Sequence, residues 1–214
     1  MSFFAEVLPA FADAASAGEF KKFLAAMQQF LPFFDRMGSM FKVVKSDIGG
    51  NVDKLLAGTA KCAANATFAS VIDADVAEGK TAKTGGSNAE SLLWLKRAME
   101  FIMLLLSKVS ETKDEVKKCA QESYEVSLGK HHNFIVRKTT SVMMGTAPGR
   151  ADLMAALGPR FVCDIQFHLI TRAPFWLLAC AGSLFLTQPL QRSCCHRRHE
   201  KMDCCCESND SGVC

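Results

Sequence analysis

Residues 41–56, FKVVKSDIGGNVDKLL, decide the fold because they carry two helical patterns at once. Apolar side chains recur at the spacing of one helix face, at Phe41, Val44, Ile48, Val52 and Leu55. The polar residues Asp47, Asn51 and Lys54 stand at i, i+4 and i+7, so they share one face of the same helix. Gly49 and Gly50 weaken this helix by roughly 1 kcal/mol each. Close approach of a ligand or a neighbouring helix would explain them, and so would a local kink.

Helix-start signals predict the helices on either side. Ser16, Ser87 and Thr112 each precede a glutamate by three residues, which is the pattern of a capping box. They predict helices that run to about residues 34, 109 and 144, and Ser39 is a plausible N-cap for the helix over 41–56. Further helices are expected over 62–77 and 150–157, with a glycine-rich loop at 79–87. The helix after Ser87 is apolar on most faces and should be central. We find no convincing strand alternation, so the body is predicted to be all-α.

Composition narrows the class of protein. The chain has 214 residues, which suits one domain with a real core, and its 25 basic and 22 acidic residues leave a net charge of +3. That balance disfavours nucleic acid and allows weak attraction to an anionic membrane. The N-terminus contains Glu6 and no basic stretch, so it does not resemble a signal peptide. Only Cys62 and Cys119 occur in the first 150 residues, as expected of a reduced, cytoplasmic body.

Two further candidate residues lie outside the first stretch. Trp94, in SLLWLKRAMEF (residues 91–101), offers a flat platform for a sugar ring, although a lone Trp more often packs in a core. His132, in SYEVSLGKHHNFIV (residues 123–136), follows His131, and on a helix only one of the two can face the core. With the polar face of residues 41–56 they could form a pocket for an amphiphile. By spacing alone, a solvated helix face is the more common explanation for Asp47, Asn51 and Lys54.

These three motifs, in this order and spacing, resemble the glycolipid transfer protein family over about residues 30–157. The resemblance implies a two-layer helical sandwich and a lipid carrier without enzymatic activity, metal or cofactor. It implies that Asp47, Asn51 and Lys54 recognise a sugar, that Trp94 stacks on the first sugar, and that His132 binds the ceramide amide together with Asp47.

The same resemblance bears on the ligand and on the membrane contact. Members that carry ceramide phosphate tend to have Arg near the position of Trp94, so Trp94 favours a glycolipid. Arg97 and Lys54 could nevertheless hold a phosphate, which keeps a phosphosphingolipid as the alternative. Phe134 lies where many members carry a Trp at the membrane-facing surface. Candidates for hydrocarbon walls, which could equally be plain core residues, are Phe30, Phe33, Phe34, Phe41, Val44, Ile48, Leu92 and Ile135.

The chain after residue 157 departs from the family. Eight of the ten cysteines lie between Cys163 and Cys214, and residues 173–191 carry no charge. We therefore divide the chain into a helical domain, residues 1–157, and an atypical tail, residues 158–214. The uncharged run approaches the length of a membrane span, but prolines and small residues make packing on the body the preferred interpretation. Its cysteines could be acylated or bind zinc, although their spacing is unusual for zinc. For the tail as a whole, the preferred interpretation is an unselected or disordered segment, from an alternative or incorrect reading of the gene.

The sequence therefore predicts a monomeric cytoplasmic protein that docks transiently on membranes and carries a glycosphingolipid between them. The alternatives are a carrier of ceramide-1-phosphate or another phosphosphingolipid, and a membrane-associated sphingolipid sensor. A hydrolase that uses Asp47 and His132 is disfavoured because no Ser or Cys lies in a recognisable nucleophile motif.

Overall fold

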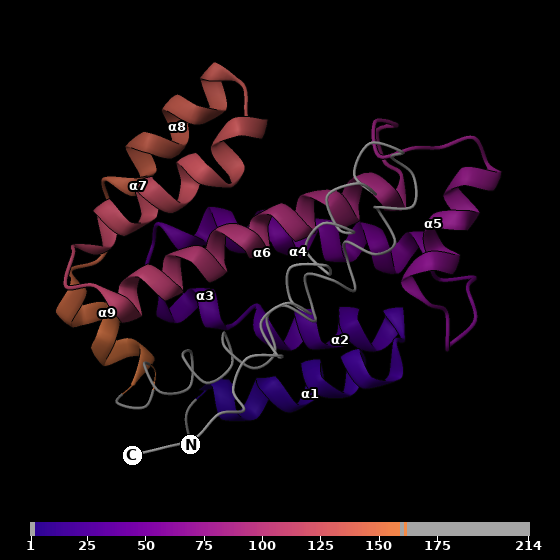
Figure 1. Ribbon diagram of the computed structural model, residues 1–214, viewed down its shortest axis with the longest axis horizontal. Coiled ribbons are helices and arrows are strands. Elements are labelled where there is room, and N and C mark those ends of the chain that lie inside the picture. Colours follow the sequence, from indigo (N-terminus) through magenta and orange to yellow (C-terminus); the bar gives the residue numbers. More distant parts are fainter. Residues whose placement is uncertain (1–2, 159–160, 162–214) are drawn as a thin grey trace, which may run out of the picture.

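The computed structural model describes residues 3–158 and 161, and within them it contains helices and no strand (Figure 1). The prediction of an all-α fold is confirmed. An isolated antiparallel bridge between Glu19 and Thr67 is the only extended pairing in the described part. The helices are α1 (Phe3–Ala17), α2 (Phe20–Phe30), α3 (Phe33–Arg36), α4 (Phe41–Gly58), α5 (Phe68–Ala77), α6 (Asn88–Glu111), α7 (Val116–Val126), the 3₁₀ helix η1 (Leu128–His131), α8 (Phe134–Met144) and α9 (Arg150–Leu157).

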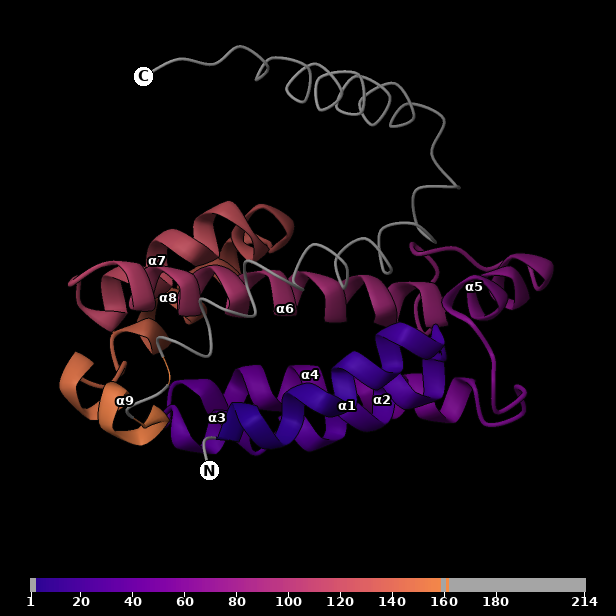
Figure 2. The same cartoon turned by 60° about the horizontal axis from the view of Figure 1, so that its bottom comes forward.

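The helices form two layers, as predicted. Figure 2 shows α1, α2, α3 and α4 in one layer and α6, α7 and α8 in the other. Helix α4 packs against α6 across the layers, while α5 contacts α6 and α9 contacts α3. The stretch over residues 41–56 thus forms most of the helix that joins the two layers. None of the helices in residues 3–158 is long and apolar enough to cross a bilayer.

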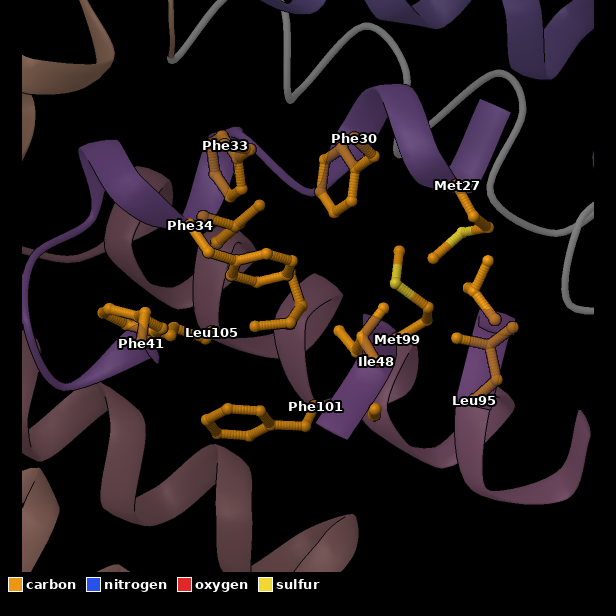
Figure 3. Packing of buried hydrophobic residues seen from close by; sticks show 14 of the residues in the cluster. Met27, Phe30, Phe33, Phe34, Phe41, Ile48, Leu95, Met99, Phe101 and Leu105 are labelled. Atoms are coloured by element: carbon orange, nitrogen blue, oxygen red, sulfur yellow. The ribbon is translucent and has the colours of Figure 1, made fainter. Parts of the chain in front are cut away.

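The core fills the space between the layers. Figure 3 shows Met27, Phe30, Phe33, Phe34, Phe41 and Ile48 of the first layer facing Leu95, Met99, Phe101 and Leu105 of α6. Phe30 stacks on Phe33 at a centroid distance of 5.0 Å and meets Phe34 edge to face at 5.4 Å. Offset and edge-on pairs of this kind add to the hydrophobic stabilisation of a core. As predicted, α6 is central, since its buried positions extend from Ala89 to Val109.

The expected hydrocarbon walls are mostly buried. The four phenylalanines, Ile48 and Leu92 are buried, and Val44 is partly buried against the same core. Ile135 is the exception, because 75% of it is exposed. It lies in the first turn of α8, a helix whose only buried residue is Met144. The prediction that Ile135 lines the interior is therefore wrong.

Several helix starts differ from the sequence-based expectation. The Ser87 hydroxyl accepts a hydrogen bond from the backbone N–H of Glu90 at 3.0 Å, which confirms the start of α6. Ser16 instead lies inside α1, and its hydroxyl donates to the Ala12 carbonyl. The Thr112 hydroxyl donates to the Lys108 carbonyl and so ends α6 instead of starting α7. In both failed cases the hydroxyl bonds backward to the carbonyl four residues earlier, Ser16 from within α1 and Thr112 from the residue after α6.

Two further boundaries were placed incorrectly from the sequence. Met40, without a side-chain cap, precedes α4 in place of Ser39. Helix α5 begins at Phe68 and not near residue 62, because Thr67 and Ser70 form a reciprocal capping box. Residues 59–66 instead contain turns, including a bond from the Cys62 N–H to the Thr59 carbonyl.

The tail is represented by only two described residues, Gly158 and Phe161. Phe161 is fully buried and belongs to the core. The uncharged run at residues 173–191 and the eight cysteines from Cys163 onward lie outside the described residues. The boundary near residue 158 remains a prediction.

Candidate functional site

A surface pocket of about 500 Å³ lies between α4, the first half of α6 and the segment that joins α7 to α8. Its lining includes all five residues that the sequence analysis assigned to head-group recognition, although they come from three separate segments. The lining residues are Ser46, Asp47, Gly50, Asn51, Lys54, Glu90, Trp94, His131, His132, Asn133 and Val136.

Helix α4 supplies the polar side of the pocket. The Asn51 amide nitrogen donates to the Asp47 backbone carbonyl at 2.9 Å, and Asn51 is buried. That bond orients the side chain and leaves its amide oxygen as an acceptor. Asp47 and Lys54 are exposed at the pocket, and neither side chain has a hydrogen bond or ion pair to another residue of the described chain. Their charges are therefore available to a ligand.

Helix α6 supplies an aromatic platform and a second carboxylate. The Trp94 ring lies nearly parallel to the imidazole of His132, with centroids 5.5 Å apart and an interplanar angle of 24°. The Arg97 guanidinium lies over the Trp94 ring, 4.9 Å from its centre. Arg97 does not itself line the pocket. Glu90 does, and its carboxylate accepts a hydrogen bond from the Gly86 backbone N–H at 2.7 Å.

The segment after α7 corrects a prediction that matters for the site. One helix to about residue 144 is expected from the sequence, but the chain breaks after Val126, passes through η1 and restarts at Phe134. Gly129 permits this turn, since a Cβ there would lie 2.9 Å from the Tyr124 carbonyl oxygen. The Asn133 side chain then caps α8 by accepting from the Val136 N–H at 3.0 Å.

This break gives both histidines access to the pocket. His132 is extended, with φ −92° and ψ 142°, and does not belong to a helix. His131 and His132 both line the pocket, but they differ in burial: His132 is partly buried against Trp94 and Tyr124, whereas His131 is exposed. His132 is thus the one that packs against α6, as expected, although a 3₁₀ turn followed by an extended residue positions it and not an α-helix.

Tyr124 supports the site and is absent from the predicted set. Its side chain is 6% exposed, and its hydroxyl lies 2.8 Å from His132 Nδ1. A phenol that donates to Nδ1 leaves Nε2 carrying the proton, as a donor for a ligand. Tyr124 is the only tyrosine of the chain and lies in the same motif as His132, eight residues earlier. A buried tyrosine hydroxyl needs a hydrogen-bond partner, and a single tyrosine next to two histidines in one motif could have identified Tyr124 as a site residue from the sequence.

The pocket changes the acid–base properties of two residues. Although water reaches Asp47, the surrounding walls remove part of its hydration and raise the pKa of its carboxyl, while the charges of His132 and Lys54 oppose this increase. Burial lowers the pKa of His132, with Asp47 opposing and Arg97 reinforcing the decrease. At neutral pH His132 is therefore a neutral imidazole, which both donates and accepts.

The chemistry of this set suits a polyhydroxylated head group. Asp47, Glu90 and Asn51 offer oxygen acceptors, Lys54 and His132 offer donors, and Trp94 offers a flat apolar surface. Ser46 is the hydroxyl of the pocket, but in the described structure no hydrogen bond joins it to either histidine. Within residues 3–158 and 161, no group of His, Cys, Asp and Glu side chains is suited to hold a metal ion.

Comparison with known proteins identifies the family. The family described as Glycolipid transfer protein (GLTP) matches residues 19–159. The chain therefore belongs to the glycolipid transfer protein family, whose members are lipid transfer proteins and not enzymes.

Individual relatives agree with this assignment. Glycolipid transfer protein 1 of Arabidopsis thaliana is 34% identical over 140 residues, which cover 63% of this chain and 67% of the relative. HET-C2, a fungal glycolipid transfer protein, shares 30% sequence identity with this chain. Its crystal structure superposes with a TM-score of 0.58, over 80% of this chain and 84% of HET-C2. A mutant of Arabidopsis ACD11 (accelerated-cell-death 11) complexed with C12 ceramide-1-phosphate has a TM-score of 0.77 at 22% identity, covering 88% of this chain and 98% of ACD11.

Proposed function

We propose that this protein binds one glycosphingolipid and carries it between membranes without making or breaking a covalent bond. The observation that supports this most directly is the meeting of Asp47, Asn51, Lys54, Trp94 and His132 in one pocket. HET-C2 is described as a glycolipid transfer protein, as is the Arabidopsis relative, which agrees with the proposal.

In the proposed complex, each polar group has a separate partner. The Asp47 carboxylate accepts hydrogen bonds from sugar hydroxyls or from the ceramide N–H, and Lys54 donates to sugar oxygens. His132 donates from Nε2 to the ceramide carbonyl, because Tyr124 occupies Nδ1. Trp94 packs against the sugar ring. Selectivity follows because a head group without hydroxyls would leave buried polar groups such as Asn51 unpaired.

The lipid chains would enter between the helical layers by displacing the core side chains that fill this space in the structure. The interior consists largely of Phe, Met and Leu side chains, whose packing adapts to flexible hydrocarbon more readily than a rigid core does. Each buried CH₂ group contributes about 0.8 kcal/mol, so hydrocarbon supplies most of the affinity and the pocket supplies the choice of head group.

The charges in the pocket favour a sugar over a phosphate. Two carboxylates, Asp47 and Glu90, line it beside the single ammonium of Lys54. Arg97, the expected phosphate contact, is engaged with the Trp94 ring and lies outside the lining. A phosphate head group would therefore meet more negative than positive charge. The fold shared with the ACD11 complex keeps ceramide-1-phosphate as the alternative ligand, to be decided by experiment.

We further propose that the protein is a cytoplasmic monomer that docks through the start of α8. Phe134 and Ile135 are 77% and 75% exposed, and Val136, the next residue, lines the pocket. Insertion of these side chains into a bilayer would bring the pocket to the membrane surface. The net charge of +3 adds weak attraction to anionic lipids.

A vesicle assay tests the proposal. Donor vesicles would carry fluorescent galactosylceramide, glucosylceramide, ceramide-1-phosphate or a glycerol-based glycolipid, and transfer to acceptor vesicles would be followed over time. We expect the two glycosphingolipids to be transferred and ceramide-1-phosphate to be ineffective. Faster transfer of ceramide-1-phosphate would replace the proposal with the alternative, and binding without transfer would support a sensor.

A further inference from the structure

Gly50 has no evident structural requirement among the residues that the structure describes. It lies in the middle of α4, where glycine is unfavourable for a helix. Its φ is not among the positive values of the described glycines, so a side chain would not strain the backbone. Within the described residues, a Cβ at Gly50 would have no heavy atom within 4 Å apart from its chain neighbours and the backbone of its own helix. Neither backbone geometry nor helix packing therefore explains this glycine.

The pocket does offer an explanation. Gly50 is one of its lining residues, on the same helix as Asp47 and Asn51, and Trp94 of α6 also lines it. The open space at its missing Cβ is consequently part of the space that a ligand can use. A side chain at this position would therefore take up space in the pocket that α4 and α6 both line.

We propose that Gly50 determines the size of the head group that the pocket admits. The absence of a side chain leaves room for a sugar ring between the acceptors of α4 and Trp94. This inference rests on the proposed function, and it adds a specificity-determining residue to it. For Gly50, it also replaces the explanation that the two adjacent glycines allow a local kink in the helix.

Gly49 provides a matched control in the same turn of α4. Its Cβ would lie 3.6 Å from a methyl group of Leu31, an ordinary packing distance, and Gly49 does not line the pocket. Substituting either glycine with alanine should favour the helix equally and raise the thermal unfolding midpoint by about 2–4 °C. Only the substitution at Gly50 removes space from the pocket.

The experiment compares Gly50→Ala, Gly50→Leu and Gly49→Ala in the full chain. Binding would be measured with galactosylceramide and with ceramide, each carrying the same acyl-chain fluorophore. We expect Gly50→Leu to weaken galactosylceramide binding about tenfold, from overpacking of the sugar, and Gly50→Ala to weaken it less. Ceramide binding should stay within about twofold of wild type, and Gly49→Ala should bind both lipids normally.

The outcomes separate the inference from the proposed function. Unchanged galactosylceramide binding by Gly50→Leu would overturn the role of Gly50, and so would an equal loss for both lipids. If the leucine variant fails to fold, the two alanine variants decide: equal galactosylceramide binding by both contradicts the inference. If wild-type protein binds no glycosphingolipid at all, the proposed function itself fails, and the inference fails with it.

Discussion

Replacement of Asp47 by asparagine tests the head-group site with little disturbance of the fold. The side chain keeps its shape and one acceptor oxygen, and it loses its charge. Asn51 bonds to the backbone carbonyl of residue 47 and not to the side chain, so that contact persists. The Asp47 carboxylate has no hydrogen bond or ion pair within the described chain, so none is lost in the free protein. Any large effect on binding must therefore come from the ligand.

The expected magnitude follows from the hydrogen bonds that the carboxylate would make. A hydrogen bond to a charged group contributes about 1.5–3 kcal/mol. Loss of one such bond should weaken galactosylceramide binding by roughly 10- to 160-fold. Equilibrium binding to a fluorescent lipid and the rate of vesicle transfer would both be measured. Asp53→Asn, on an exposed part of the same helix, is the matched control and should bind normally.

Stability and pH dependence provide an independent check. Because the pKa of Asp47 is raised in the folded protein, its ionisation opposes folding as pH increases from the unfolded value of 3.8 through the folded value. Above that window, Asp47→Asn should be as stable as wild type or slightly more stable. Wild-type binding should decrease as pH falls toward the raised pKa, and the variant should lack this component. Binding by Asp47→Asn within about twofold of wild type at pH 7 would refute the assignment of Asp47.

Three further predictions concern other parts of the site. Tyr124→Phe should shift the tautomer equilibrium of His132, which the ¹⁵N spectrum of the imidazole reports. Loss of one neutral hydrogen bond should also weaken galactosylceramide binding by about fivefold. An unchanged spectrum would contradict the positioning role of Tyr124. Glu90→Gln keeps an acceptor for the Gly86 N–H but removes a charge, so the affinity for ceramide-1-phosphate relative to galactosylceramide should increase about fivefold; no change in that ratio would exclude charge repulsion by Glu90. Phe134→Ala should reduce partitioning onto vesicles by about tenfold or more while leaving unfolding unchanged, whereas normal vesicle binding would move the docking surface elsewhere.

The local pattern of residues 41–56 was sufficient to predict the polar face of α4. Asp47, Asn51 and Lys54 share one face of α4 because helical spacing depends only on backbone geometry. Their place in a pocket was predicted from the family resemblance, since spacing alone favoured a solvated face. The same applies to α6, where an apolar character on most faces correctly predicted a central helix. The family resemblance then added Trp94 and His132, which no local pattern relates to α4.

The breaks between helices were much less predictable. Ser16 and Thr112 have the sequence of an N-cap, but each hydroxyl bonds backward to a carbonyl four residues earlier, in α1 and α6 respectively. Which carbonyl or N–H such a hydroxyl reaches depends on where the neighbouring helix ends. The break after Val126 similarly depends on the close approach of Gly129 to Tyr124. Asn133, which caps α8, was a local signal for this break that the helical periodicity obscured.

The sequence by itself determined the all-α class, the polar face of α4 and the central position of α6, because periodicity and capping act within a few residues. Only the tertiary structure decided that both histidines reach the pocket, that Tyr124 holds His132, that Arg97 lies over Trp94, and that the missing side chain of Gly50 faces open space. These features arise where α4, α6 and the segment before α8 meet. Their geometry depends on how whole helices pack across the two layers. The sequence alone does not predict such contacts, because the contacting segments are far apart in the chain and no local residue pattern relates them.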